Sequence, residues 1–376
     1  MSEEKQLKTS TGYFDVVANV LIDENTFSLN QVGKNNANWI SNIFNPKVDA
    51  GNGQSMFMKF NSGFDKVNGK TIYAISESDS SLQIPFADRK NDALLKVVKD
   101  SSFIKVGYKK EVVKNPENGK EYKQWVYEKF VDAYDVVEFL QRVMPLATTQ
   151  KVHIKGKIKF SANNGEVYRN FDLQTIYLLN GNEDEGKELP LKLEFTQNIL
   201  LKEGSIDRKD EDKGIITVNA LILNKSKGEY QTLPVKYLVK FNEEDKNAKL
   251  NMINKYLEAP EGKVRRVNVL GLFEVGSSSG SVTYDDLPQE AKDLVDDGIY
   301  SMEEIQKIYA KQDFVNNLLI RKPVVKKLDN SIKIDFDDDE YTLADLEGKS
   351  ADVDEEIDLD LGDSEENDLL KELEDL

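Results

Sequence analysis

The sequence predicts a mainly β protein with helical additions: two small barrels in tandem, a short C-terminal helical hairpin and a disordered acidic tail. Three observations support this fold class. Short runs of alternating apolar and polar residues, which are typical of strands, recur along most of the chain. One pattern of strands and a helix occurs twice, and the acidic residues are concentrated near the C-terminal end.

Composition restricts the classes of function. The chain has 376 residues, 39% of them apolar, which is enough for two to three domains with buried cores. It has no cysteine, which excludes disulfides, thiolate metal sites and cysteine nucleophiles, and a single histidine, which excludes His-rich zinc sites and makes most acid-base schemes of enzymes awkward. No apolar run approaches the length of a transmembrane helix, about 18 residues, and no apolar signal segment is visible. We expect a cytoplasmic protein without catalytic activity, cofactor or metal.

The first hundred residues are mostly β in pattern. Trp39 and Phe44 delimit an apolar group at helical spacing within a stretch rich in Asn and Gly, so we expect a loop with one short helix over 25–53. The other elements expected in this part are a helix over 87–99 and strands over 12–23, 55–60, 70–75 and 103–113.

A hairpin with its turn at 115–120 comes next, and its returning strand combines aromatic and basic side chains. Trp125 and Tyr127 fall on one face together with Lys123 and Lys129. Aromatic rings stack on bases, at about 1 to 3 kcal/mol per base, while neighbouring lysines contact phosphates. The strand therefore indicates a stacking platform for nucleic acid. The alternative is that Trp125 and Tyr127 belong to the core, as large aromatic residues in strands often do.

The strand over 151–160 has one cationic face and one apolar face. Lys151, Lys155, Lys157 and Lys159 alternate with apolar residues, and the only histidine lies in the same row. A row of like charges without carboxylates indicates an anionic partner. The alternative is the solvated outer face of an antiparallel sheet.

One order of strand, turn, strand, helix and strand occurs over 120–160 and again over 228–275. Each copy has an amphipathic helix, and the glycine in each final strand, Gly156 or Gly271, suits a tight bend at a barrel corner. A helix inserted between strands of a small antiparallel sheet is the layout of the five-stranded OB barrel. We therefore expect one barrel domain over 1–160 and a second over 161–276.

The second barrel has a thinner basic edge than the first. Three further strands are expected, over 167–179, 189–201 and 214–224, and the charged segment 202–213 is interpreted as a solvated loop. The candidate nucleic-acid-binding residues in this part are Tyr168, Arg169, Lys236, Lys240, Arg265 and Arg266.

After the barrels, residues 277–334 combine three features. A Gly- and Ser-rich stretch at 276–281 predicts a flexible linker, since it lacks the lysine of a phosphate-binding loop. A helical hairpin follows, and its second helix is expected to begin at the capping box 301–304 and to end near residue 311. Residues 321–327 form a basic strand or arm.

Residues 335–376 contain 20 of the 68 acidic residues and two of the 50 basic ones, a net charge of −18, so the rest of the chain is neutral. This segment is too charged and too poor in aromatic residues to pack, and we expect a disordered tail. Leucines near its end can form one helical face for binding a partner protein; a purely solubilising tail would need none. These residues are Leu369, Leu370, Leu373 and Leu376.

The arrangement resembles single-stranded-DNA-binding proteins, in particular those of bacteriophages, which combine OB barrels with an acidic C-terminal tail. The resemblance rests on the repeat, the lysine strand and the tail. It implies a replication and recombination accessory protein of the host cytoplasm that coats unwound DNA and recruits replication proteins through its tail. The last residues, 372–376, lack the aromatic and proline tip found in bacterial members of that class.

The sequence thus predicts a non-catalytic protein that binds single-stranded DNA without sequence choice. The alternative is a protein-interaction or virion-assembly protein whose tail is an anionic arm. A carboxylate nuclease with two metal ions needs a fixed acidic cluster in the folded body, and the sequence shows none that is convincing.

Overall fold

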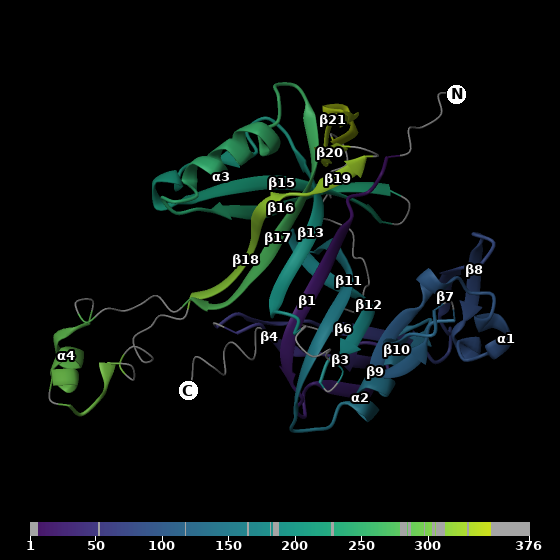
Figure 1. Cartoon of the computed structure of the whole chain (residues 1–376). Helices are drawn as coiled ribbons and strands as arrows, with labels where there is room; N and C mark the ends of the chain where they lie inside the picture. Colours follow the sequence, from purple (N-terminus) through teal and green to yellow (C-terminus); the bar gives the residue numbers. More distant parts are fainter. Residues whose placement is uncertain are drawn as a thin grey trace.

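The chain folds around one 14-stranded sheet that runs through the body, which confirms the mainly β class (Figure 1). Its central strands are β1 (Gly12–Leu21) and β13 (Lys192–Leu201), paired antiparallel with Phe14 opposite Phe195. The computed structural model describes residues 7–51, 53–116, 118–163, 165–180, 182, 188–226, 229–278, 284, 287–296, 298–302, 305, 313–328 and 331–346.

The second half of the sheet closes into a five-stranded barrel. α3 (Lys246–Met252) continues into a π-helix (Ile253–Leu257) and connects the third strand of the barrel to the fourth in chain order. The barrel is of the OB type that the repeat predicts. Starting and ending at β13, the strands pair in the order β15 (Ile215–Ser226), β16 (Glu229–Lys240), β18 (Asp313–Pro323), parallel to β16, and β17 (Val264–Ser278).

The first half is an open version of the same layout. β1 pairs with β11 (Thr149–Asn163), β11 with β12 (Glu166–Leu178), and β9 (Ile104–Lys114) lies parallel to β12. β10 (Glu121–Phe130) forms a hairpin with β9 and has no other strand partner among the described residues. α2 (Ala133–Val143) precedes β11, as α3 precedes β17.

The two glycines of the repeat lie at equivalent bends. The register of β11 on β12 shifts at Gly156, and that of β17 on β18 shifts at Gly271. A Cβ atom would lie 2.6 Å from the ring of Phe14 at the first position and 2.3 Å from the ring of Phe195 at the second. Because only glycine admits such a close ring, the predicted tight bends are confirmed.

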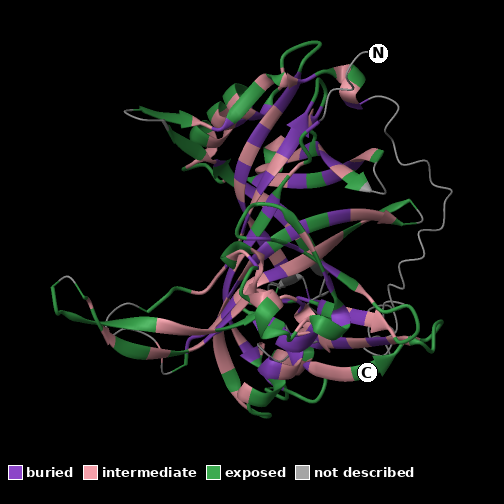
Figure 2. Cartoon of the chain, turned by 90° about the vertical axis from the view of Figure 1, so that its right-hand side faces the viewer, coloured by how far each residue is buried: buried purple, intermediate pink, exposed green. Residues whose placement is uncertain are grey.

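One apolar core extends through both halves. The ring of Phe14 contacts that of Phe171 at 5.3 Å between centroids, and Phe273 contacts Phe171 at 5.8 Å and Phe195 at 5.1 Å. Figure 2 shows buried residues alternating with intermediate and exposed ones along the strands of the body. The expected boundaries after 160 and 276 fall inside β11 and β17, whose hydrogen-bonded partners are β12 and β18. The division into domains stays a prediction.

The segment between β1 and β9 adds small sheets, and the helix expected near Trp39 is wrong. β3 occupies this position, with Ile40, Asn42 and Phe44 buried at strand spacing. The Asn42 amide donates to the Tyr134 carbonyl (3.1 Å), so a buried polar residue obscured the alternation. The helix expected over 87–99 is a single turn, α1. The elements are β2 (Phe27–Val32), β3 (Trp39–Phe44), β4 (Lys47–Asp49), β5 (Ser55–Phe57), β6 (Phe60–Asp65), β7 (Thr71–Ile75), β8 (Ser81–Pro85), α1 (Asp92–Leu95) and two 3-10 turns, Phe86–Asp88 and Asp100–Ser102.

The C-terminal part contains the first helix of the expected hairpin, α4 (Gln289–Asp296), on which Leu287 and Ile305 pack. The second helix lies mostly outside the described residues. The expected linker at 276–281 is wrong for its first half, because residues 276–278 are the last of β17 and pair with β18. Residues 279–281 lie outside the described residues. The remaining elements are β14 (Ile206–Asp207), the 3-10 turn Glu211–Lys213, β19 (Val325–Leu328), β20 (Ser331–Ile334), β21 (Phe336–Tyr341) and α6 (Leu343–Leu346).

The expectation that disorder begins at Asp335 is wrong for residues 335–346. β21 pairs with β17, and Tyr341 and Leu346 are buried beside Leu7. Asp335 accepts hydrogen bonds from Arg266 (2.9 Å), and Lys326 lies 2.7 Å away. Basic side chains from other parts of the sequence neutralise these acidic residues, and the composition of the segment alone does not reveal such pairing. Residues 347–376, with the four leucines, lie outside the described residues.

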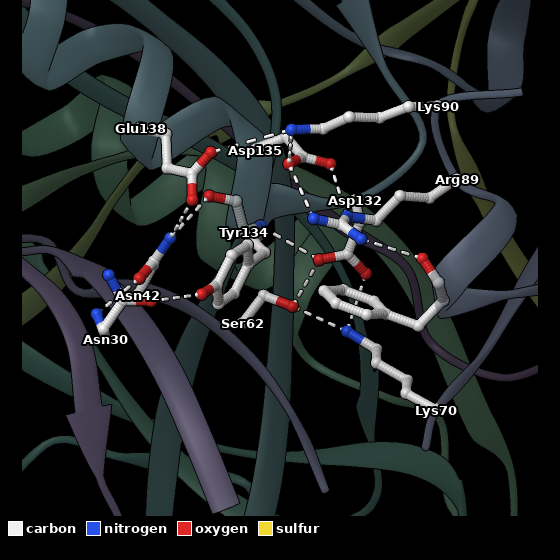
Figure 3. A network of polar contacts seen from close by, with 11 residues as sticks. Asn30, Asn42, Ser62, Lys70, Arg89, Lys90, Asp132, Tyr134, Asp135 and Glu138 are labelled. Carbon is white, nitrogen blue, oxygen red and sulfur yellow. Dashed lines mark hydrogen bonds and ion pairs between the residues drawn. The ribbon is translucent and has the colours of Figure 1, made fainter. Parts of the chain in front are cut away.

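A buried polar network attaches the small sheets to α2 (Figure 3). Asp132 caps α2 by accepting from the Tyr134 backbone N–H (2.9 Å), and it also binds Ser62 (2.5 Å) and Lys70 (2.6 Å). One turn further along, Asp135 accepts from the guanidinium of Arg89 (2.8 Å). Figure 3 shows these side chains converging: Ser62 comes from β6, Lys70 from just before β7, Arg89 from the turn before α1, and the two aspartates from the start of α2. The network therefore attaches the segment between β1 and β9 firmly to the first half of the sheet.

We expect Asp132→Ala to lower the free energy of unfolding by about 3 kcal/mol, because it removes a helix cap and leaves the Lys70 ammonium, only partly exposed, without its carboxylate. Urea denaturation measures the change. The matched control is Asp92→Ala, an exposed residue in the first turn of α1, which should change stability by less than about 0.5 kcal/mol. Equal effects of the two substitutions would contradict the role of the network.

Candidate nucleic-acid interface

Trp125 and Tyr127 lie on the surface of the β9–β10 hairpin, outside the apolar core clusters of the described residues. Both are half-buried, and both contact Tyr177 of β12, with ring centroids 5.1 Å and 6.0 Å away. The Tyr127 hydroxyl lies 3.5 Å from that of Tyr177. The interpretation of Trp125 and Tyr127 as core residues is therefore not supported by their packing.

Gly107 provides the space for these rings. It lies opposite Tyr127 in β9, and a Cβ atom at this position would lie 2.8 Å from Tyr177 and 3.1 Å from Trp125. His153 of β11 extends the group, since its ring centroid lies 5.6 Å from that of Tyr177. We call Trp125, Tyr127, Tyr177 and His153 the aromatic cluster.

The lysine row of β11 continues directly from the aromatic cluster, but neighbouring strands place acids beside it. Lys155 lies 3.6 Å from Asp15 of β1, and Lys159 lies 2.5 Å from Asp172 of β12. Lys151 bonds Glu188 at 2.8 Å. The row lacks carboxylates only within β11 itself. The lysine row therefore presents less net positive charge to a ligand than the sequence of β11 alone suggests.

Lys157 differs from the rest of the row. It is exposed, and among the described residues no ion pair is recorded for its ammonium. Tyr13 of β1 lies directly opposite Lys157 in the sheet and is 45% exposed. An exposed ring beside an unneutralised lysine repeats, on a smaller scale, the combination found at the aromatic cluster.

Asp15 connects the cluster to the centre of the sheet. It accepts a hydrogen bond from His153 (2.7 Å), and Lys192 lies 3.1 Å away. Burial alone would raise the pKa of Asp15, but the hydrogen bonds from His153 and Lys192 outweigh it and hold the pKa well below its usual range. The carboxylate therefore stays ionised at neutral pH and orients the basic groups around it.

Tyr168 and Arg169, both in β12, have different surroundings. Tyr168 is 40% exposed and donates to Glu166 (2.9 Å). Arg169 stacks on Phe273 of the second half, 4.9 Å from the ring centroid, and donates to Asn316 (2.9 Å). Burial lowers the pKa of Arg169 to about 10. This geometry favours a packing role for Arg169 at the junction of the two halves.

The basic residues of the second barrel are mostly paired. Lys240 contacts both carboxylate oxygens of Glu274 at 2.7 Å, whereas Lys236 is exposed beside a shallow pocket of the barrel surface. Arg265, 6% exposed, makes a bidentate contact with Asp338 (2.6 and 2.7 Å). Arg266 binds Glu340 (2.5 Å), besides Asp335. The assignment of both arginines to a nucleic-acid site stays a prediction, and it requires β21 to move.

Three members of this surface were missed by sequence reasoning: Tyr177, Tyr13 and Lys110, whose ammonium lies 5.1 Å from the Trp125 ring centroid. Tyr177 and Tyr13 come into place through the pairing of β11 with β12 and β1. The alternation of each strand showed which face they occupy, but the register between distant strands is not encoded in any local pattern.

The described residues contain no helix long and apolar enough to cross a membrane. They also contain no group of three or more histidine or acidic side chains arranged to hold a metal ion.

Comparisons with known proteins add little. No protein-family model matches the chain, and no curated protein matches it. One similar solved structure is a deletion mutant of the single-stranded DNA binding protein from Thermus aquaticus, with 7% sequence identity, coverage of 86% of this chain and 99% of that chain, and a TM-score of 0.31. At this identity and score the likeness supports no statement about function. The bacteriophage origin implied by the resemblance stays a prediction.

Proposed function

We propose that the protein binds single-stranded DNA with little sequence preference. The observation that carries the proposal is the continuity of the aromatic cluster with the lysine row of β11 on one face of the first half. Every base offers a π-face and every nucleotide a phosphate, so such a surface binds any unpaired strand. A duplex, whose bases already stack on each other, gains nothing from the rings.

The DNA strand in this proposal follows β11. Bases stack on Trp125 and Tyr127 at one end. Tyr13 offers a further ring opposite Lys157, which lies about 13 Å along β11 from His153 of the aromatic cluster. Phosphates between these positions lie near Lys155 and Lys157. The carboxylates of Asp15 and Asp172 partly offset the lysines, so stacking carries a large share of the affinity.

In the cell, the proposed role is in DNA replication and recombination: the protein covers unwound DNA and recruits replication proteins through residues 347–376. The closed barrel with its inserted helix, and the concentration of acidic residues after residue 346, support this role.

Quenching of tryptophan fluorescence by a polythymidine oligomer should show tight binding, and a duplex of the same length should bind much more weakly. With about four to eight phosphates neutralised, the logarithm of the affinity should fall against the logarithm of the salt concentration with a slope of roughly −3 to −6. Equal affinities for both forms, or an affinity that does not respond to salt, would exclude the proposal.

Substitutions in β10 and β11 can separate the roles of rings and lysines. Trp125→Ala should weaken binding of single strands by about 1 to 3 kcal/mol and leave the salt slope unchanged, because a stacking contact is lost. Tyr122→Ala is the matched control: it removes a ring 48% exposed on the opposite face of the same strand, and affinity should not change. Lys157→Ala should instead reduce the salt slope by about one unit. The assignment fails if Tyr122→Ala is as damaging as Trp125→Ala.

Removal of residues 347–376, which carry a net charge of −12, should tighten binding of single strands, most strongly at low salt. A tethered polyanion competes with DNA at an effective concentration of about millimolar, and salt screens this competition. The truncation starts after Leu346 because Tyr341 and Leu346 are buried in a small apolar cluster with Leu200, Leu223 and Val264 of the barrel strands. Affinity is measured by the same titration at several salt concentrations.

A second variant separates charge from apolar contacts: Leu369, Leu370, Leu373 and Leu376 are all changed to Ser. This variant keeps the charge of the tail, so its DNA affinity should equal that of the intact chain, whereas binding of a replication partner should be lost. An unchanged affinity after truncation, at every salt concentration, would show that the tail does not reach the lysine row.

A further inference from the structure

The outer edge of β10 is unoccupied among the described residues. β10 is the last strand on its side of the sheet, and β9 is its only strand partner in the part of the chain that the structure describes. In the second half β16 lies parallel to β18 as β9 lies parallel to β12, so β15 takes the place of β10, and β15 is bounded by β16 on one side and by β13 on the other. The duplication thus leaves one edge open in the first half. An exposed edge of this length offers unpaired backbone N–H and C=O groups to another strand.

The sequence of β10 is complementary to itself when two copies run antiparallel and are centred on Trp125. In this register Glu121 of each copy lies opposite Lys129 of the other, which gives two ion pairs, and Lys123 lies opposite Tyr127. On the other face Tyr122 lies opposite Glu128. Residues opposite each other point to the same face, as an antiparallel ladder requires.

Other registers of the same pairing are less favourable. A slip of two residues in one direction places Lys123 opposite Lys129 in both copies, and like charges directly opposite each other are destabilising. A slip in the other direction places Lys129 opposite Gly119 of the hairpin turn and shortens the ladder. A slip of one residue would turn one copy over, so that the aromatic clusters of the two copies would lie on opposite faces of the joined sheet. Charge and the length of the ladder together therefore favour one register.

The present partners of these charges do not prevent the pairing. Glu121 lies 3.7 Å from Lys114, and Lys129 lies 2.7 Å from Asp100, all on exposed side chains. Exposed ion pairs of this kind contribute about 0 to 1 kcal/mol and are easily shared or exchanged. The chain already joins its two halves in the same manner, since β1 and β13 pair antiparallel with Phe14 opposite Phe195.

We propose that two copies of this chain associate by antiparallel pairing of their β10 strands, centred on Trp125. The two-fold axis stands perpendicular to the sheet, so both aromatic clusters lie on the same face and become one surface. The dimer forms without DNA, and this proposal therefore does not depend on the proposed function.

Charge reversal across the pair tests the proposal by sedimentation velocity of the full chain without DNA, over a wide range of protein concentration. The intact chain should show a monomer–dimer equilibrium. Glu121→Lys and Lys129→Glu should each weaken dimerisation by about tenfold, because each turns two attractions into two repulsions. The double variant should restore it, and an equimolar mixture of the two single variants should form the heterodimer.

The control is Glu111→Lys, the same change of charge on β9, which has no partner across the proposed interface and should leave the equilibrium unchanged. A chain that stays monomeric at all concentrations would overturn the proposal. So would a dimer that is insensitive to both single reversals, since the contact would then lie elsewhere. A third outcome is a monomer that dimerises only after residues 347–376 are removed. It would mean that these residues of the same chain cover the edge of β10, and it would also overturn the proposal for the intact chain.

Discussion

The antiparallel pairing of β1 with β13 is the constraint on which the rest of the structure depends. It sets Phe14 against Phe195, and each ring occupies the space left by a glycine in the neighbouring strand, Gly156 or Gly271. Through Phe171 and Phe273 the same rings form one continuous core. The two copies of the repeat are therefore one cooperative body, and a change at either glycine disturbs packing in both halves.

The electrostatics follow from this arrangement. The body up to residue 346 carries a net charge of −6, since residues 347–376 account for −12 of the total of −18. Such a body can segregate its charges or pair them, and this chain mostly pairs them across strands. Asp15 lies among His153, Lys155 and Lys192, while β21 neutralises Arg265 and Arg266. The surface left for an anionic strand is narrow, and its aromatic residues define it as much as its lysines do. A phosphate that binds there must displace a carboxylate from its lysine. Salt therefore weakens both the lysine–carboxylate contact and the lysine–phosphate contact that replaces it.

Local patterns in the sequence predicted the hairpin, both helices of the repeat, the bends at its glycines and the outward face of β10 and β11, because each depends on residues close together in the chain. What they missed depends on pairing at a distance. Tyr177 joins Trp125 only through the parallel contact of β9 with β12. The acidic residues of β21 were expected to be disordered because their basic partners lie about 70 residues earlier in the sequence. Asn42, buried and polar, made a strand resemble a helix.

The contact of Leu7 and Lys8 with Tyr341 and Leu346 has a consequence for synthesis on the ribosome. Leu7 packs with Tyr341 and Leu346, and the Tyr341 hydroxyl donates to the Lys8 carbonyl (2.6 Å). The strand that closes the barrel, β18, is also made late. During translation the second barrel therefore stays open, with β13 and β17 exposing apolar residues, until β18 has emerged. Folding of the first half can begin much earlier, and this early half offers β1 as a template on which the later strands assemble.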